Sequence, residues 1–402
     1  MFRTAAMIMI MSMLAGACSK NNGPEKPEDN TGQTTGPGGN GSGDQGNSGN
    51  EGGSGDEGGN EGGTSGGDHG GSGDQGDQPK PQITANSWMT AIDDDTKIAL
   101  LTIPGAHDAA TSTCAGPGKC QTLTISGQLE HGVRAFDLRP TMDNNSTLGN
   151  IYHSILDTGV SMGDAMEYFD SFLKTHPGEG IIVIMRYESE RQIFGSIAED
   201  NYKTAMKNFL WNNRIYQSRM AAFNKSMTMK DLRGKILIIS RNDLSPVSTF
   251  ETAYTQWSHS NSVGEALQIY GTGGLGRIYI QDMYSAEKNG NSSEADFLAK
   301  KKELVCKLLD ITVPFREYEQ NNWVINYCSG YAGSSFASDS YAKNAASTNP
   351  AALEHIQAHT GKGFTGIVMM DYAGTDTYEV GGSTFSVSGK SLTEALIMNN
   401  FQ

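Results

Sequence analysis

The sequence has little positive charge, few cysteines and no long hydrophobic run near its start. It holds 30 lysines and arginines against 45 aspartates and glutamates, and so lacks the basic excess of a nucleic-acid-binding protein. The apolar run at residues 5–17 is too short to span a bilayer. The five cysteines and eight histidines show no spacing typical of a zinc site. We therefore expect no nucleic acid partner and no metal.

The first 18 residues are typical of an export signal. Arg3 supplies the positive start, and the run 5–17 has the length of a signal-peptide apolar region. Small residues then precede a lone Cys18, which resembles a bacterial lipoprotein signal in which that cysteine carries the lipid anchor. Leu14 stands four residues before the cysteine rather than the usual three, so plain secretion with cleavage near Ala17 stays open. Both readings predict an exported chain, either lipid-anchored at the bacterial cell envelope or secreted.

Residues 19–82 are expected to form a disordered linker. The stretch consists mainly of Gly, Ser, Asn, Asp, Glu and Gln, and has almost nothing apolar to bury. Within it, residues 19–79 hold eleven acidic side chains against two lysines, so most of the formal charge of −15 lies outside the folded part. A coil of about 60 residues reaches roughly 45 Å. We expect a tether between the anchor and residues 83–402.

Export also changes how the other cysteines are interpreted, because an oxidising compartment favours disulfides. Cys114 and Cys120 close a short Gly/Pro loop and form a plausible local pair. Cys306 and Cys328 could also pair, although sequence alone cannot establish it.

From residue 83 onward the composition is that of one folded domain. Eight apolar runs are strand-like, most of them continuous, as in parallel strands that are buried on both faces. Helical stretches lie between most of them, but the second and third runs are joined without one. We therefore predict an α/β fold, a (β/α)8 TIM-type barrel in which one unit lacks its helix. The runs are 98–103, 133–138, 149–152, 180–185, 235–240, 277–281, 323–327 and 366–370, and the helices 162–175, 193–211, 293–309, 352–358 and 392–400.

The first of these strands carries a His-Asp pair. The apolar run 98–103 is expected to end at Pro104-Gly105, and His107 and Asp108 follow directly. In a barrel of this kind the active site lies at the carboxyl ends of the strands. Taken alone, the pair could equally be part of a turn.

The other strand ends favour a site. Histidines serve as general base and acid, and arginines match phosphate in a bidentate manner. Two histidines and three arginines converging on one rim with aspartate partners suit an anionic, phosphate-bearing substrate. The residues that follow the strands are His107 and Asp108, Arg139, His153, Arg186, Arg241, Asp282 and Tyr284, and Asp371.

Several short segments, in order, resemble bacterial phosphatidylinositol-specific phospholipases C. The resemblance covers essentially all of residues 87–402 and is strongest at Ile-Pro-Gly-Ala-His-Asp (103–108) and at residues 128–139. Tyr152-His153, the segments 234–237 and 281–284, and Met370-Asp371-Tyr372 follow in the family's order.

The resemblance implies a mechanism. His107 would be the general base that takes the proton of the inositol 2-hydroxyl, and His153 the general acid that protonates the departing diacylglycerol oxygen. Arg139 would stabilise charge on the phosphate, at the place where eukaryotic relatives hold a calcium ion. Asp371 would orient His107, and Asp108 would be the partner of His153 and Arg139.

The resemblance also implies the substrate and its binding residues. Arg241, Asp282 and Tyr284 match positions that grip the inositol ring, and Arg186 falls near a family lysine. The implied substrate is phosphatidylinositol at a membrane surface, cleaved to diacylglycerol and inositol 1,2-cyclic phosphate, with glycosyl-phosphatidylinositol anchors as a second possibility. A monomer without cofactor or metal is expected.

Two alternatives remain at this point. A metal-dependent glycerophosphodiester phosphodiesterase on a similar barrel would need further carboxylates near the first strand. A non-catalytic surface protein that binds inositol phosphates would be expected to lack one catalytic histidine, whereas both are present. Ala106 and Ala109 flank the His-Asp pair where the family commonly has threonine and serine, which leaves substrate preference open.

Overall fold

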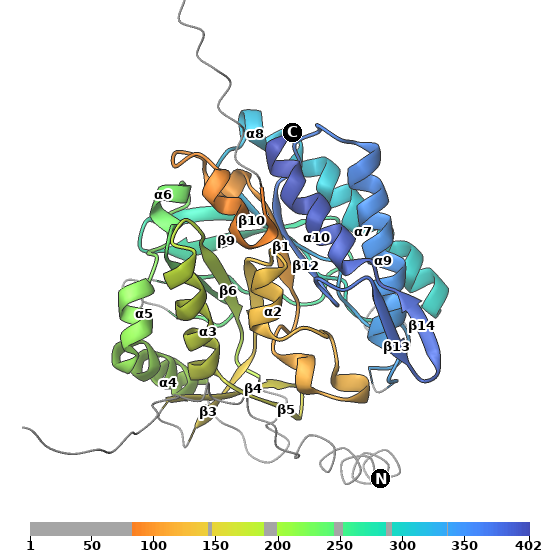
Figure 1. The fold of residues 1–402 in the computed structure, drawn as a ribbon, viewed down its shortest axis with the longest axis horizontal. Helices are drawn as coiled ribbons and strands as arrows, with labels where there is room; N and C mark the ends of the chain where they lie inside the picture. The colour runs from red at the N-terminus through yellow and green to blue at the C-terminus, as the bar shows by residue number, and fades with distance from the viewer. Residues whose placement is uncertain (1–82, 144–146, 189–198, 245–251, 287–291, 336) are drawn as a thin grey trace, which may run out of the picture. The chain divides into compact units, whose positions relative to one another are not determined.

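The structure, a computed structural model, describes residues 83–143, 147–188, 199–244, 252–286, 292–335 and 337–402. The predicted signal segment, the linker and the first part of the expected helix 193–211 lie outside these residues. Nine strands form a closed barrel in the order β1-β12-β11-β10-β9-β8-β7-β6-β2 (Figure 1). They are β1 (Thr102–Ala106), β2 (Ala135–Leu138), β6 (Ile181–Met185), β7 (Ile236–Ser240), β8 (Ala253–Tyr254), β9 (Glu265–Gly271), β10 (Gly274–Gln281), β11 (Asn322–Tyr327) and β12 (Gly366–Met370).

The strands are buried on both faces. In β6, Ile182 and Ile184 face one hydrophobic cluster with residues of β7, β10 and β11, whereas Val183 and Met185 belong to a second cluster with Phe169 of helix α3 (Met162–Thr175). Alternate side chains of a strand point to opposite faces. Continuous apolar runs therefore fill both the barrel interior and the layer beneath the helices, which confirms the predicted TIM-type α/β barrel.

Helices cover the outside of the barrel, and α7, α9 and α10 lie together on one side of it (Figure 1). Helix α3 confirms the expectation for 162–175: Ser161 and Asp164 form a capping box at its start, and the helix ends before Pro177. The helices are α2 (Ile125–Glu130), α3 (Met162–Thr175), α4 (Glu199–Asn212), α5 (Arg214–Arg219), α6 (Met229–Leu232), α7 (Glu294–Thr312), α8 (Phe315–Tyr318), α9 (Ser340–Ala358) and α10 (Gly389–Met398).

The place predicted for the barrel's irregularity was wrong. The run 149–152, expected as the third barrel strand, lies in β4 (Thr147–His153), the middle strand of a separate antiparallel sheet with β3 (Pro140–Asp143) and β5 (Leu156–Ser161). The irregular part of the barrel is instead residues 252–281, which contain no helix and bring in β8 and the antiparallel β9.

The first strand also starts and ends later than predicted. Residues Ile98–Leu100 form a 3-10 turn, and β1 runs through Pro104 and Gly105 instead of ending there. A β-carbon on Gly105 would lie 2.3 Å from the sulfur of Met369 in β12. Glycine at this position therefore allows the two parallel strands to pack closely, and the Pro-Gly pair is part of the barrel wall.

Neither suggested disulfide is present in the structure, in which the four described cysteines form no disulfide with one another. The Cys120 sulfur lies 4.0 Å from an oxygen of Asp108, and the Cys306 sulfur lies 3.8 Å from the carbonyl of Ala351. The thiols of Cys120 and Cys306 thus each have a polar neighbour other than a second cysteine.

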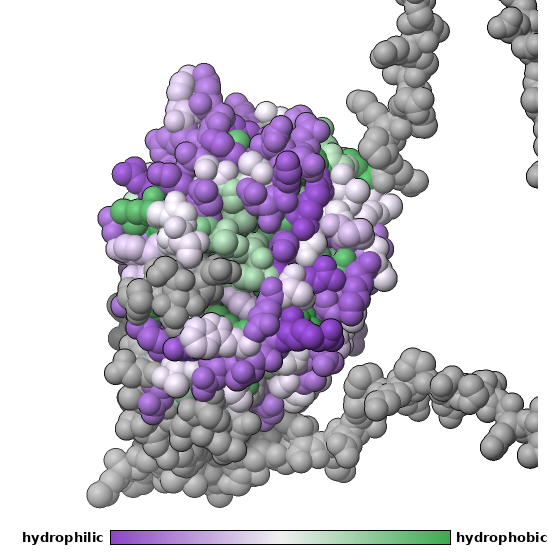
Figure 2. Space-filling model, turned by 90° about the vertical axis from the view of Figure 1, so that its left-hand side faces the viewer, coloured by the Kyte–Doolittle hydropathy of each residue, from purple (hydrophilic) through white to green (hydrophobic). Residues whose placement is uncertain are grey.

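A hairpin of β13 (Thr377–Val380) and β14 (Ser383–Ser386) follows the last barrel strand. The side of the molecule that lies to the left in Figure 1 is mostly hydrophilic, with hydrophobic residues gathered near its centre (Figure 2). Among the described residues, no helix has the length and apolar character needed to cross a bilayer.

Candidate active site

The predicted site residues lie at the carboxyl ends of strands or directly after them, where barrels of this type place their sites. The parallel register of β1 and β12 pairs Ala106 with Met370. His107 directly follows Ala106 at the end of β1, and Asp371 directly follows Met370 at the end of β12. The backbone N–H of His107 donates to the Met370 carbonyl at 3.0 Å, so the register itself brings histidine and aspartate side by side.

Gln121 fastens this junction. Its side-chain amide donates to the carbonyls of His107 at 2.7 Å and Met370 at 2.9 Å, and its oxygen accepts from the N–H of Ala373 at 2.9 Å. The side chain is fully buried. One glutamine from the loop after β1 thereby ties that loop to the end of β12, which limits movement of the two catalytic candidates relative to each other.

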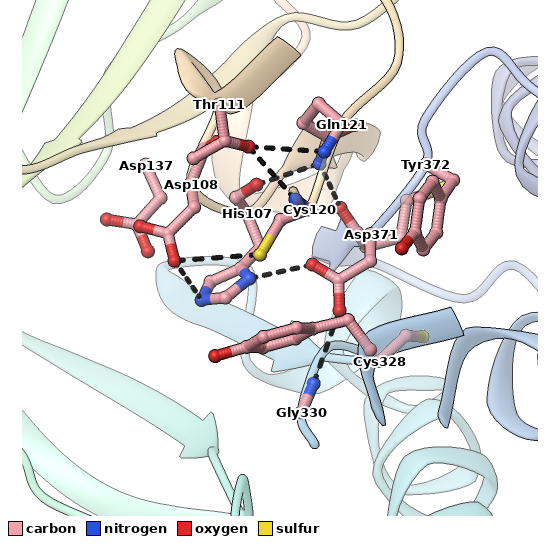
Figure 3. Close-up of polar contacts among 12 residues, drawn as sticks. His107, Asp108, Thr111, Cys120, Gln121, Asp137, Cys328, Gly330, Asp371 and Tyr372 are labelled. Atoms are coloured by element: carbon pink, nitrogen blue, oxygen red, sulfur yellow. Dashed lines mark hydrogen bonds and ion pairs between the residues drawn. The ribbon is translucent and has the colours of Figure 1, made fainter. Parts of the chain in front are cut away.

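The His107 ring lies between two carboxylates, as Figure 3 shows. Its Nδ1 is 2.8 Å from an oxygen of Asp371, and its Nε2 is 3.2 Å from Asp108 and 2.8 Å from Nη2 of Arg139. A carboxylate only accepts hydrogen bonds, so Nδ1 carries a hydrogen that it donates to Asp371. In the neutral ring, Nε2 therefore carries the lone pair, which faces Arg139. Nε2 is the atom that can take a proton.

The surroundings keep this histidine strongly basic. Burial lowers the pKa of His107, but the negative charges of Asp108 and Asp371 outweigh burial and the opposing charge of Arg139, and raise the pKa to about 8. A base with a pKa near the operating pH is well matched to proton abstraction.

Arg139 is held by three acids. Its Nε lies 3.0 Å from Asp108, its Nη2 lies 3.0 Å from Asp137, and its Nη1 lies 4.0 Å from Glu188. Burial raises the pKa of Asp108, but the positive charges of Arg139, His107, His153 and Arg186 together outweigh it and lower that pKa to about 2. The guanidinium is consequently a fixed positive charge beside the base.

His153, at the end of β4, lies on the other side of Asp108. Its Nε2 is 3.5 Å from the same oxygen of Asp108 that is 3.2 Å from His107. Its Nδ1 is 2.9 Å from the carbonyl of Gly118, so Nδ1 is the donor there. The reactive nitrogens of both histidines thus flank one carboxylate oxygen, close to Arg139.

The backbone is strained next to three of these side chains. Only four described non-glycine residues have a positive φ, and three of them are Asp108 at 44°, Ser154 at 56° and Tyr372 at 57°. Each follows a site residue directly: His107, His153 and Asp371. Left-handed conformations at such residues persist only where the surrounding structure enforces them, and they concentrate at functional sites.

A second group of side chains lies at the ends of β7 and β10. The guanidinium of Arg241 stacks on the ring of Trp257 at 3.9 Å and lies 3.7 Å from Asp282, which also accepts from the Trp257 indole at 2.9 Å. Tyr327, at the end of β11, connects the groups: its ring is 6.2 Å from both His107 and Trp257. Both groups therefore belong to one site.

The structure places the remaining two predicted residues less centrally. Arg186 is half-buried after β6, and its charge contributes to the low pKa of Asp108. Tyr284 packs edge-on against His259 at 5.0 Å, and its backbone N–H donates to that histidine at 3.2 Å.

Asp137 is the clearest residue of the site that the sequence analysis did not single out. It is fully buried and touches Arg139. Residues two apart in a strand share a face, so the spacing Asp-x-Arg could have revealed the pair. Tyr327 and Trp257 carried no such signal, because isolated aromatic residues at strand ends are usually packing residues.

Among the described residues, three groups of side chains have a geometry that could hold a metal ion, and the one formed by His107, Asp108 and Asp137 lies next to Arg139. In that group each carboxylate already faces the guanidinium at 3.0 Å. Arg139 thus occupies the position in which a cation would satisfy these acids, and the residues fit a guanidinium better than a metal.

Comparison with known proteins agrees with this geometry. The profile of the family described as phosphatidylinositol-specific phospholipase C, X domain, matches residues 107–242. The chain is 25% identical over 299 residues to a 1-phosphatidylinositol phosphodiesterase of Staphylococcus aureus, which covers 72% of this chain and 88% of that protein. A Listeria monocytogenes protein of the same name is 35% identical over 171 residues, covering 40% of this chain and 51% of that protein.

The fold agrees as well. A crystal structure of a phosphatidylinositol-specific phospholipase C from Staphylococcus aureus, carrying a fluorinated phenylalanine, superposes with a TM-score of 0.61 at 23% identity, covering 79% of this chain and 97% of that one. The family match begins at His107 and includes Arg139, His153, Arg186 and Arg241. Residues 107–242 therefore match the X-domain family of phosphatidylinositol-specific phospholipases C, and the chain is similar in sequence and fold to bacterial proteins of that kind.

Proposed function

We propose that the chain is a phosphatidylinositol-specific phospholipase C that cleaves phosphatidylinositol to diacylglycerol and inositol 1,2-cyclic phosphate. The observation that supports it most is the pair of histidines on either side of one oxygen of Asp108, beside the buried Arg139. A phosphate that contacts Arg139 would have a base and an acid within reach at the same time. In-line displacement at phosphorus requires this arrangement, because one oxygen arrives as another leaves.

The reaction then follows from the protonation states. His107 Nε2 takes the proton of the inositol 2-hydroxyl, whose oxygen forms a bond to phosphorus. The bond from phosphorus to the glycerol oxygen breaks, and His153 Nε2 gives its proton to that oxygen. Because the nucleophile belongs to the substrate, no water has to be positioned and little entropy is lost. Arg139 stabilises the charge that develops on the phosphate oxygens.

Two carboxylates support these steps. Asp371 holds His107 in the tautomer whose Nε2 is free to accept and stabilises the imidazolium that forms. Asp108 contacts both histidines and Arg139, and its negative charge holds these three side chains close together. The barrel positions these side chains. Their contacts with one another suit a phosphodiester that has a neighbouring hydroxyl.

We assign inositol binding to the second group of side chains. Arg241 and Asp282 offer donors and acceptors for ring hydroxyls, and both side chains are nearly buried. Tyr284 presents an aromatic surface nearby, and Arg186 adds positive charge on the side of Asp108. Substitution of Arg241 or Asp282 should raise KM more than it lowers kcat, if they bind ground state and transition state alike.

Both alternatives considered from the sequence are less favoured. A metal-dependent phosphodiesterase would need carboxylates free to bind the ion, whereas Asp108 and Asp137 are engaged by Arg139. A non-catalytic binder of inositol phosphates would not need two histidines on either side of one Asp108 oxygen beside Arg139. The geometry therefore supports the proposal of an acid-base pair.

The assignment is tested by alanine substitution of each histidine and assay on vesicles containing phosphatidylinositol. His107→Ala and His153→Ala should each slow cleavage about 10²–10⁴-fold, the usual contribution of acid-base catalysis. His176→Ala is the matched control: this histidine ends α3, before the amino end of β6 and away from the site. If either site variant retained the control's rate, the role given to that histidine would be wrong.

For the rest of the chain, we propose that residues 1–18 direct export, that Cys18 carries a lipid and that residues 19–82 form the tether of a catalytic barrel at 83–402. The proposal is supported by the charged start, the short apolar run and the small residues before Cys18. A tethered monomer would reach phosphatidylinositol, and possible glycosyl-phosphatidylinositol anchors, on a nearby membrane surface.

A further inference from the structure

The contacts of His153 single out one more residue. Its Nδ1 donates to the Gly118 carbonyl, so proton transfer is left to Nε2. That atom lies 3.1 Å from the hydroxyl of Tyr341, closer than the 3.5 Å that separates it from Asp108. The rings of His153 and Tyr341 meet edge to face, with centroids 5.4 Å apart.

Tyr341 is built into the fold at this position. It lies in the first turn of α9 and is 5% exposed, within an apolar cluster that includes Cys120 and Tyr372. Burial raises the pKa of Tyr341 well above its ordinary value, and nearby Cys120 and Asp108 raise it further. The hydroxyl is therefore neutral and can either donate or accept a hydrogen bond.

We propose that Tyr341 is a positioning residue for His153, an inference that rests on the acid role proposed above. When His153 is protonated, Nε2–H can donate to the Tyr341 oxygen. After the proton has gone to the glycerol oxygen, Tyr341 turns its own hydrogen toward the lone pair of Nε2. One contact thus holds the ring in both states, whereas the Asp108 carboxylate can only accept and serves the protonated state alone.

The consequence is specific to leaving groups that need a proton. Diacylglycerol must be protonated as it departs, whereas 4-nitrophenol leaves as a stable anion. Tyr341→Phe keeps the ring and removes only the hydroxyl. We expect its kcat on phosphatidylinositol to fall about tenfold or more with little change in KM, a part of the usual acid-catalysis contribution. On an inositol 1-phosphodiester of 4-nitrophenol, the rate should stay within about twofold of the parent.

The ratio of the two rates on one preparation is the readout, because it cancels any loss of folded protein. Tyr378→Phe is the matched control: Tyr378 packs against the same apolar cluster and stacks on Tyr372. Its ratio should equal that of the parent. An unchanged ratio for Tyr341→Phe, whether both rates fall together or neither falls, would overturn the proposal.

The variant His153→Ala distinguishes a failure of this proposal from a failure of the acid role proposed for His153. If that variant loses activity on phosphatidylinositol but keeps it on the nitrophenyl ester, the acid role stands and the result for Tyr341→Phe bears on Tyr341 alone. If His153→Ala loses both equally, the acid role itself fails. The double variant should be no slower on phosphatidylinositol than His153→Ala, and a further loss would mean that Tyr341 does not act through His153.

Discussion

At the scale of single residues, the site depends on charges that are buried together. His107 and Arg139 are each held by carboxylates that are themselves at most 3% exposed on the side chain. In a low-dielectric site such pairs interact more strongly than in water. The acids therefore both fix the geometry and set the protonation state of the base.

The first prediction concerns pH. His107 must be neutral to act as a base, and its pKa is about 8 because Asp108 and Asp371 outweigh burial. Below that pH the imidazolium dominates, so deprotonation of His107 should give kcat/KM an ascending limb that rises about tenfold per pH unit toward pH 8, and the need for a protonated His153 should give a descending limb. Asp371→Asn removes one negative charge, so its ascending limb should move to lower pH, with a lower maximum because the tautomer is no longer fixed. A limb that stays in place would contradict this role for Asp371.

The second prediction concerns the shape of Arg139 rather than its charge. A lysine keeps the charge but cannot reach Asp108, Asp137 and His107 together. Arg139→Lys should therefore lower kcat about 10²–10³-fold, as the loss of a preorganised charge stabiliser does. Arg277→Lys, on an exposed residue in the amino-terminal half of β10, is the control and should leave the rate unchanged. Near-parent activity of Arg139→Lys would show that a point charge is sufficient.

At the scale of elements, the parts that sequence could predict are those coded locally. Continuous apolar runs marked seven of the nine barrel strands, and capping residues marked α3. Strand β9 was missed because it has no continuous apolar run: in its first half, partly buried and exposed side chains alternate. Helix α9 was expected only from residue 352, whereas it starts at Ser340 and continues through Pro350 because its packing overrides the local signal.

The site divides in the same way. His107, Arg139, His153 and Asp371 could be predicted because each follows a strand-like run or a family motif. Tyr341 could not, because it is 188 residues from His153 in sequence and meets it only through the placement of α9. Side chains that act through long-range packing leave no local pattern.

A third prediction tests how α10 holds the end of β12. A β-carbon on Gly389, the first residue of α10, would lie 2.0 Å from the carbonyl oxygen of Tyr372, and a backbone atom cannot easily move away. Gly389→Ala should therefore lower the free energy of unfolding by about 1–3 kcal/mol. Gly163→Ala, in the first turn of α3, meets only Ser161 at 3.5 Å and should change it by less than about 0.5 kcal/mol. Denaturant titration of both variants measures the difference, and equal stabilities would contradict the account.

At the scale of the whole molecule, the chain combines a compact barrel with a polar segment of different composition. The described residues carry all of the catalytic groups proposed above, so we expect the chemistry not to depend on residues 1–82. The fourth prediction follows: Cys18→Ser should release the exported protein from the membrane fraction while its rate on the soluble nitrophenyl substrate is unchanged. Fractionation and assay of both forms provide the test, and membrane retention of the variant would argue against an anchor at Cys18.

The central claim is that Arg139 and two histidines cleave the phosphodiester without a metal. The most direct measurement is ³¹P NMR of phosphatidylinositol vesicles incubated with the purified protein in excess chelator. We predict undiminished conversion of the phosphodiester signal to that of inositol 1,2-cyclic phosphate. Loss of activity on chelation with recovery on adding a divalent cation, or direct formation of the acyclic phosphate, would contradict the account.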